Sequence, residues 1–205
     1  MKTRAICAIT TLLFIASFGT GNSQNYRALK PQQTTIYSIF SDFYFGMRVD
    51  SVSIQGTDTT FHLLENLQQM DFDCFHADGP SWMGDRIIVR PNGETSFFNG
   101  WNEEIVIKTQ APVGEEWMCY TNPLINYRAT VASIGTETFL GITDSVKTFT
   151  FQAVSPDGLN ISTMINYLQI KLSLNYGFIR TFNFYSFPQI GLGLTRQDAG
   201  ECYLI

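Results

Sequence analysis

The sequence predicts a mainly β protein: a single antiparallel domain with a curved sheet or open barrel, and a two-sheet β-sandwich as the alternative. Short runs rich in Val, Ile, Thr, Phe and Tyr alternate with Gly, Asn, Asp and Pro, which is typical of strands separated by turns. The connections are too short for the crossovers that parallel strands need. Helical periodicity is scarce, so we expect about ten to twelve antiparallel strands.

The first 23 residues have the three parts of a secretory signal peptide. Lys2 and Arg4 give a positive start, residues 5–18 are almost entirely apolar, and residues 19–23 are small or polar. The apolar run is short for a spanning helix, so a cleaved leader is favoured over an uncleaved membrane anchor. We therefore expect residues 24–205 to form an exported β-rich domain that is secreted, periplasmic or on the cell surface.

The charge balance of the chain limits its partners. The whole chain has 13 Lys and Arg against 18 Asp and Glu, and loss of the leader would leave 11 basic residues. An acidic domain without a basic cluster argues against nucleic-acid binding. No second segment reaches the roughly 18 apolar residues of a transmembrane helix, so we expect no membrane span in the mature chain.

The first half of the mature chain predicts a series of hairpins. Pro91-Asn92-Gly93 is the strongest turn signal, because Asn-Gly suits a turn that needs positive φ. A short helix within 62–70 is the alternative to a strand there. The expected strands are residues 47–54, 59–67, 86–90, 94–98, 105–109 and 117–120.

The second half predicts a more regular meander. Residues 135–136 and 143–145 are expected to be turns, and 161–168 is a candidate short helix. The expected strands are residues 127–134, 137–142, 146–154, 168–173 and 178–184.

Cys74, Cys119 and Cys202 remain after the leader, and their spacing fits no zinc or redox motif. A disulfide between Cys74 and Cys119 is one interpretation, because an exported protein meets an oxidising compartment. Three buried free thiols are the alternative, and we favour it.

Four segments occur in an order that resembles a known group of proteins. They are APVGEEW at 111–117, YRATV at 127–131, GITDSVKT at 141–148 and IKLSLNYGFI at 170–179. The chain resembles the N-terminal region of large exported proteins of Bacteroidetes-type bacteria, over roughly residues 37–190. Many of those proteins end in a type IX secretion sorting domain, which is not found in this sequence. The resemblance implies export, and the N-terminal part of a longer protein is one expectation. It assigns no functional residues.

The densest polar cluster of the sequence lies at residues 71–78. In an extended segment, Asp71, Asp73, His76 and Asp78 come within reach of a cation. Carboxylates suit Ca²⁺, whereas the histidine favours a transition metal, so both ions are candidates. The alternative is an acidic surface loop that ends in the turn at 78–80.

Aromatic side chains give a second candidate site. Trp82, Phe97, Phe98 and Trp101 flank predicted turns, where side chains can reach the surface. Exposed rings on a β scaffold can stack on a glycan or hold a peptide or protein ligand. The alternative is that these rings close the ends of a barrel or sandwich.

No catalytic motif is present in the sequence, and His62 and His76 are the only histidines. The adjacent pairs Glu103-Glu104 and Glu115-Glu116 project to opposite faces of a strand and make no acid–base pair. The sequence therefore predicts a non-enzymatic binding or interaction module. A secreted hydrolase without a readable motif is the alternative.

Overall fold

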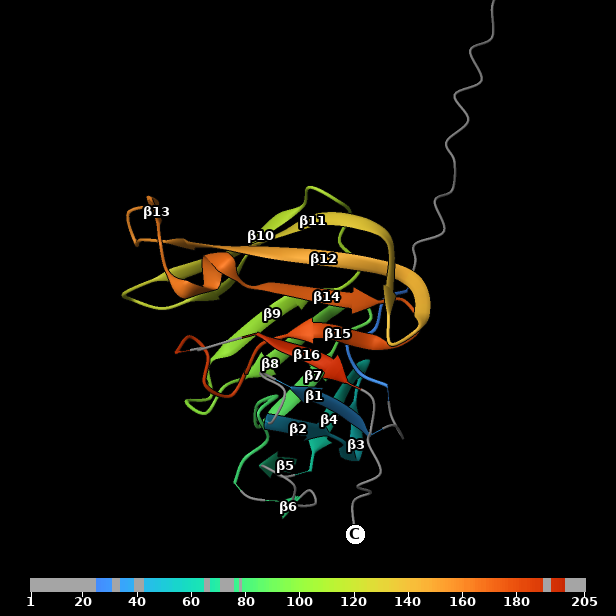
Figure 1. Cartoon of the computed structure of the whole chain (residues 1–205). Coiled ribbons are helices and arrows are strands. Elements are labelled where there is room, and N and C mark those ends of the chain that lie inside the picture. Colours follow the sequence, from blue (N-terminus) through green and yellow to red (C-terminus); the bar gives the residue numbers. More distant parts are fainter. Residues whose placement is uncertain are drawn as a thin grey trace, which may run out of the picture.

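The computed structural model describes residues 25–30, 34–38, 43–64, 67–70, 76–77, 79–189 and 193–197 (Figure 1). These residues form sixteen strands and one short 3₁₀ helix, η1 (Met164–Tyr167). The mainly β, antiparallel fold predicted from the sequence is confirmed. The predicted leader at 1–23 lies outside the described residues, and so do Cys74 and Cys202.

The larger sheet has 11 strands, in the order β10-β11-β12-β14-β15-β16-β1-β2-β5-β6, with β13 also paired to β12. Its strands are β10 (Glu116–Thr121), β11 (Asn126–Phe139), β12 (Ile142–Val154), β14 (Gln169–Ser173), β15 (Gly177–Thr181), β16 (Leu194–Gln197), β1 (Thr35–Ser38), β2 (Phe43–Met47), β5 (Leu67–Met70), β6 (His76–Ala77) and β13 (Asn160–Ile161). The smaller sheet has five strands, in the order β3-β4-β7-β8-β9. They are β3 (Val49–Gln55), β4 (Asp58–Leu63), β7 (Arg86–Val89), β8 (Glu94–Phe98) and β9 (Glu104–Lys108).

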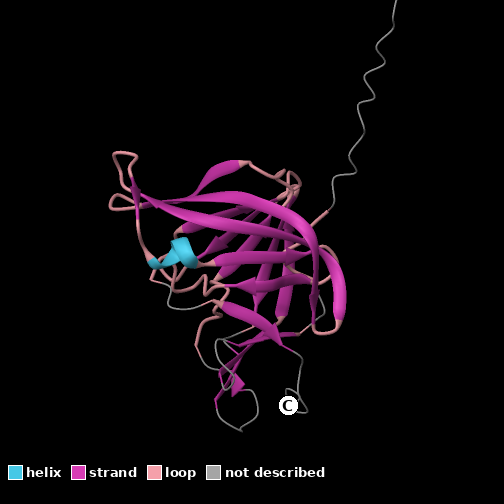
Figure 2. Cartoon of the chain, turned by 45° about the horizontal axis from the view of Figure 1, so that its top comes forward, coloured by secondary structure: helices cyan, strands magenta, loops and turns pink. Residues whose placement is uncertain are grey.

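The larger sheet is strongly curved and arches over the smaller one (Figures 1 and 2). Within the described residues neither sheet closes on itself, because the strand orders end at β10 and β6 and at β3 and β9. The fold therefore combines the predicted curved sheet with the two-sheet arrangement of the alternative.

A bent ribbon joins the two sheets on one side. The chain passes from β2 to β3 through Arg48, and β2 pairs with β5 while β3 pairs with β4. The backbone N–H of Leu64 donates to the Arg48 carbonyl at 3.0 Å, which continues the pairing across the bend. On the other side, β9 and β10 are linked because Trp117 Nε1 donates to the Val106 carbonyl at 2.8 Å. Side chains from both sheets consequently share one core.

The β11–β12 hairpin differs from the sequence prediction. Turns were expected at 135–136 and at 143–145, but β11 continues through the first pair and β12 through the second segment. The single turn lies at Leu140 and Gly141, with φ of 49° and 72°. Two consecutive positive φ values give the turn geometry that matches the twist of a hairpin. Gly135 stays in the strand, paired with Val146. The Gly-Thr pair was a misleading turn signal, since glycine is tolerated inside a strand.

Two other local predictions have definite outcomes. The short helix expected within 161–168 is confirmed as η1. The helical alternative at 62–70 is wrong for the described residues, since His62 and Leu63 belong to β4 and residues 67–70 form β5. No helix in the described parts of the chain has the length and apolar character of a membrane-spanning helix.

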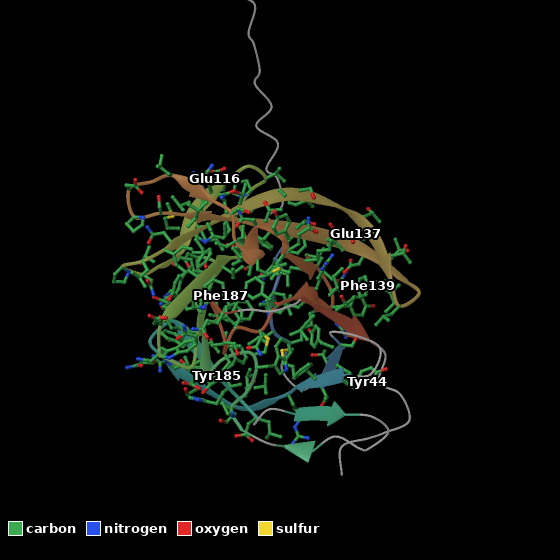
Figure 3. The ribbon with its side chains drawn as sticks, turned by 60° about the vertical axis from the view of Figure 1, so that its left-hand side comes forward. Tyr44, Glu116, Glu137, Phe139, Tyr185 and Phe187 are labelled. Atoms are coloured by element: carbon green, nitrogen blue, oxygen red, sulfur yellow. The ribbon has the colours of Figure 1, made fainter. Side chains whose placement is uncertain are left out.

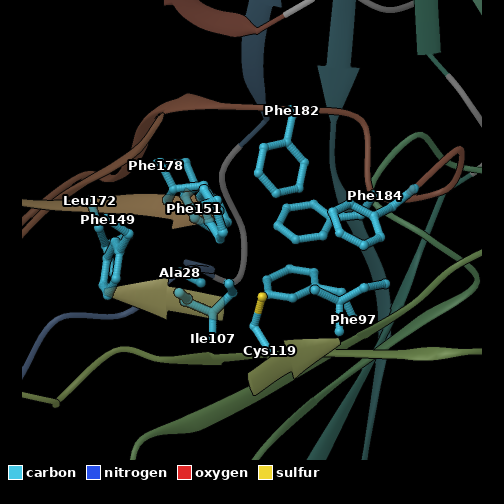
Figure 4. Close-up of a cluster of buried hydrophobic side chains, with 14 of the residues drawn as sticks. Ala28, Phe97, Ile107, Cys119, Phe149, Phe151, Leu172, Phe178, Phe182 and Phe184 are labelled. Carbon is cyan, nitrogen blue, oxygen red and sulfur yellow. The ribbon is translucent and has the colours of Figure 1, made fainter. Parts of the chain in front are cut away.

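The core is rich in aromatic side chains from the inner faces of both sheets. The inner face of β12 contributes Phe149 and Phe151, and β15 contributes Phe178 (Figure 4). Cys119 of β10 lies in this core as a free thiol, and its Sγ donates to the Tyr127 carbonyl at 3.2 Å. Cys119 is therefore not disulfide-bonded. This agrees, for Cys119, with the favoured interpretation that the cysteines are buried free thiols.

Candidate functional site

One end of the molecule is filled by aromatic rings; we call it the aromatic end (residues 97–103, 120–127 and 182–188). Phe182, Phe184 and Phe187 are fully buried. The Phe184 ring stacks on Phe97 with centroids 3.9 Å apart (Figure 4), and Phe187 packs edge-on against Tyr120 at 5.1 Å. Figure 3 brings forward this side of the molecule, with Phe187 apart from Phe139 near the β11–β12 turn.

A buried amide fixes the loops of the aromatic end. The Asn99 Nδ2 donates to the Phe187 carbonyl at 2.8 Å and to Glu103 Oε2 at 2.9 Å. The Asn99 Oδ1 accepts from the backbone N–H groups of Trp101 and Glu103. Tyr120 donates to the same Glu103 oxygen at 2.6 Å. Burial and this contact raise the pKa of Tyr120 to about 12, so the tyrosine is a hydrogen-bond donor at neutral pH.

A cavity of about 300 Å³ lies at the opposite end, which we call the cavity end. The segment 25–29 forms one wall, and Tyr26, Ala28 and Leu29 of this segment are buried. The other walls come from the inner face of the five-stranded sheet, the β3–β4 and β7–β8 turns, and Thr109 and Gln110 after β9. The cavity therefore forms between the start of the described chain and the smaller sheet.

Threonines make the sheet wall of the cavity polar. In the cross-strand register, Thr59, Val89, Thr95 and Ile107 follow one another on β4, β7, β8 and β9, next to a row of larger apolar residues. Thr95 is 1% exposed, and its hydroxyl has no hydrogen-bond partner among the described residues. This hydroxyl is not one of the buried side-chain atoms that lack a partner, so it is accessible from the cavity. The Thr109 hydroxyl donates to the Gly93 carbonyl at 3.0 Å. A ligand can satisfy the Thr95 hydroxyl.

The turn after β7 shapes the mouth of the cavity. Gly93 has a φ of 82°, and a Cβ atom on it would lie 2.5 Å from Gln110 Cγ. Only glycine allows this positive φ together with such a close approach. Gly93 consequently holds Gln110 against the wall of the cavity.

The charged residues at the cavity are basic. Arg27 is exposed and has no ion pair within the described residues, whereas Arg90 pairs with Glu104 at 3.1 Å and Asp58 at 3.9 Å. Burial opposes the ionisation of Glu104, but hydrogen bonds from Ser96 and Arg90 outweigh it and lower the pKa of Glu104. The charge of Arg90 is therefore largely matched, and that of Arg27 is not.

Lys147 lies behind the cavity wall. It is 2% exposed, and its Nζ donates to the carbonyls of Thr109 and Ala111 at 2.8 Å. The Nζ also lies 4.7 Å from the centre of the Tyr26 ring, which lines the cavity. Burial lowers the pKa of Lys147 to about 8, so the side chain is mostly protonated at neutral pH.

The four aromatic residues predicted as a ligand surface do not form one. Trp82 and Phe97 are buried, and Trp82 Nε1 donates to the Gly46 carbonyl at 2.8 Å. Phe98 faces the outer side of the sheet beneath the Arg86 guanidinium, 3.9 Å from the ring centre. Only Trp101, 57% exposed, presents its ring to solvent. The expectation of exposed rings was wrong for Trp82 and Phe97, because inward-facing strand positions place them in the core.

The predicted metal cluster lies mostly outside the described residues. Asp71, Asp73 and Asp78 lie outside the described residues, and only the backbone of His76 is described, in β6. The described residues contain no group of three or more His, Cys, Asp and Glu side chains suited to a metal ion. A Ca²⁺ or transition-metal site at residues 71–78 stays a prediction.

The described residues offer little for nucleophilic catalysis. Ser53 Oγ and His62 Nε2 are 3.5 Å apart on an exposed strand pair, too far for a good hydrogen bond. Burial raises the pKa of Cys119 to about 12, so this thiol is not a nucleophile at neutral pH. Glu103 and Glu104 have separate structural partners, as their expected opposite orientations require.

The cavity was not predicted from the sequence, although a signal for it exists. On β4 and β8, threonine stands two residues from an inward-facing phenylalanine, in the pairs Thr59–Phe61 and Thr95–Phe97. Because residues two apart share a strand face, these threonines also point inward.

Comparisons with known proteins found no match among protein-family models, curated proteins or solved structures.

Proposed function

We propose that the chain is an exported, non-enzymatic binding module and that the cavity between segment 25–29 and the five-stranded sheet is its ligand site. The hydroxyl of Thr95, which has no partner among the described residues and belongs to the cavity wall, carries this proposal. A hydroxyl that has no protein partner and is reached from the cavity can donate to and accept from a ligand. Its position inside the cavity favours binding of a small molecule there.

The composition of the cavity supports binding over turnover. Its lining contains threonines, glutamine, asparagine and arginines, with Phe61 and Tyr26 as apolar surfaces. These groups position a ligand through hydrogen bonds and ring contacts but include no nucleophile paired with a base. A hydrolase at this site would have to recruit its base from residues that do not line the cavity.

The cavity volume favours a small ligand. About 300 Å³ is at the lower limit of small-molecule sites, which suits a monosaccharide or an amino acid. A glycan or peptide could therefore place one residue in the cavity and extend outward, which agrees with the glycan or peptide ligands considered from the sequence.

Blocking the cavity tests the proposal. Ligand-observed NMR with a panel of monosaccharides and amino acids should detect binding to the wild-type protein. A Thr95→Leu variant should lose this binding, because Thr95 lines the cavity and the larger leucine side chain would occupy the space of the ligand. The matched control is Thr60→Leu, one residue from Thr59 on the outer face of β4, and it should bind normally. Equal binding by both variants, or no binding by the wild type, would contradict the proposal.

The resemblance to exported proteins of Bacteroidetes-type bacteria supports the proposed export. Cleavage after Ser23 would start the mature chain one residue before Asn25, where the cavity wall begins. N-terminal sequencing of protein recovered outside the cytoplasm should give Gln24 as the first residue. Recovery of the intact leader in the cytoplasmic fraction would argue against export.

A further inference from the structure

We infer that the ligand of this cavity is a small hydroxylated carboxylate, of the sugar-acid class. This inference rests on the proposed function, and it adds the charge and the chemistry of the ligand. Three features support it: the sign of the charged residues that line the cavity, the unpaired guanidinium of Arg27 that dominates this sign, and the hydroxyl groups of the wall.

The charged residues that line the cavity are opposite in sign to the net charge of the whole chain, and Asp58 and Glu104 beside it offset only Arg90. Among the described residues, the lining contains Arg27 and Arg90 and no Asp or Glu, although the protein has a formal net charge of −5. A concave site lined by one sign of charge concentrates ions of the other sign. Because the remaining surface is acidic, an anion is attracted to this site more than to the rest of the molecule.

Arg27 is the group that would contact the anion. Arg90 already shares its guanidinium with Glu104, Asp58 and Ser96. Arg27 has no such partner in the described residues, and its neighbours Tyr26 and Ala28 are buried, so the backbone that carries it is fixed. A guanidinium presents two parallel N–H groups that match the two oxygens of a carboxylate. A fixed and unpaired arginine therefore favours a carboxylate.

Lys147 adds a positive charge that cannot move away. Its two bonds to the Thr109 and Ala111 carbonyls hold the ammonium behind Tyr26 and Thr109, both of which line the cavity. The charge of Glu115 acts on Lys147, but Glu115 is already paired with Lys108 at 3.0 Å. The ammonium does not touch the ligand, but its charge favours an anion in the cavity.

The polar side chains in the cavity wall favour an anionic ligand that also has hydroxyl groups. Thr95 offers an unpaired hydroxyl, and Thr59 and Gln110 add further polar groups beside Phe61. A hydroxyl can both donate to and accept from a ligand hydroxyl, and an aromatic ring can pack on the apolar face of a sugar. A bare anion such as acetate or phosphate would leave these groups without partners, whereas a sugar acid would satisfy them.

Matched pairs of sugars test the inference by isothermal titration calorimetry. The probes are glucuronate against glucose and galacturonate against galactose, with acetate and inorganic phosphate as simple anions. At least one acid should bind about tenfold more tightly than its neutral partner, which corresponds to about 1.4 kcal/mol. Arg27→Gln should remove this preference and leave the weaker binding of the neutral sugar. Arg128→Gln, at an arginine already paired with Glu116, is the control and should behave like the wild type.

The outcomes separate the two proposals. Equal binding of acid and neutral sugar would overturn the anion inference and leave the binding site in place. Equal binding of acetate, phosphate and the sugar acids would overturn the hydroxyl requirement. Retained preference in Arg27→Gln would overturn the role of Arg27. Loss of all binding in Thr95→Leu, together with loss of acid preference in Arg27→Gln, would support both. If none of the probes bind the wild-type protein, the ligand class is wrong, and silence of the wider NMR panel then rejects the binding function itself.

Discussion

The aromatic end and the cavity end are built from the same strands, yet one is filled and the other is hollow. On β8, Phe97 stacks on Phe184 in the aromatic core, and Thr95, two residues earlier on the same face, lines the cavity. On β4, Phe61 and Thr59 also share the inner face, and both of them border the cavity. The row Phe61, Ile87, Phe97 and Ile105 is entirely apolar, and the next row contains two threonines. A change of two side chains in one cross-strand row thus separates a packed core from a polar cavity.

The largest expected effect is at the aromatic end. Phe184→Ala should lower the free energy of unfolding by about 3–5 kcal/mol, because it removes a fully buried ring and leaves a void. Phe61→Ala is the matched change at the cavity end, and it should cost less because Phe61 borders existing empty space. Guanidinium denaturation followed by circular dichroism measures both. Equal losses would show that the two ends do not differ in packing.

Asn99→Ala should have the next largest effect. It removes four hydrogen bonds and leaves the Phe187 carbonyl and two backbone N–H groups without their partner, at a cost of about 3 kcal/mol. The comparison at the cavity end is Asn92→Ala, which removes one exposed bond to the Glu94 N–H and should cost about 0.5–1 kcal/mol. Urea denaturation of the two variants gives the difference. A cost below that of Asn92→Ala would contradict the structural role of Asn99.

The third prediction concerns pH and Lys147. The folded-state pKa of about 8 lies below the ordinary value of 10.5, so between these values the unfolded chain binds a proton that the folded chain has lost. Stability therefore rises with pH in this window, by about 2 kcal/mol from pH 8 to pH 9.5. Burial raises the pKa of Cys119 from 9.0 to about 12. Above about pH 9 this thiol therefore lowers the stability of the folded protein as the pH rises, which is opposite to the effect of Lys147.

Lys147→Met isolates this contribution, because Cys119 and the tyrosines are present in both proteins. As the pH rises from 8 to 9.5, the unfolding free energy of the wild type should increase relative to that of the variant. Thermal unfolding at several pH values measures it. Parallel pH profiles for the two proteins would contradict a lysine that loses its charge on folding.

The smallest expected effect is that of Thr95→Val. The variant loses a hydroxyl that has no partner in the described residues, so the free energy of unfolding should change by less than about 0.5 kcal/mol or rise slightly. The comparison is Thr109→Val, which removes a bond to the Gly93 carbonyl and should cost about 1 kcal/mol. A clear loss of stability in Thr95→Val would reveal a partner for its hydroxyl.

The sequence predicted local structure better than the site. The hairpin through Pro91-Asn92-Gly93 and the strand at residues 94–98 follow from turn chemistry and strand composition, which act over a few residues. The long β11–β12 hairpin was divided wrongly because a leucine, Leu140, takes a positive φ that its type disfavours. The cavity depends on segment 25–29 packing against strands far along the chain, and no local pattern encodes that contact. The burial of Trp82 likewise depends on Gly46, 36 residues away.

The bent ribbon has a consequence for the alignment of its strands. The same two chain segments pair in both sheets, from Phe43 opposite Met70 to Gln55 opposite Asp58 at the turn of Gly56. A slip of one residue in a pair of strands moves every inward side chain to the outer face. The pairing shifts register between Val49 and Ser51, and from that point to the hairpin end the turn at Gly56 sets the alignment. One short turn therefore acts as a common reference for Phe61 and Thr59 beside the cavity.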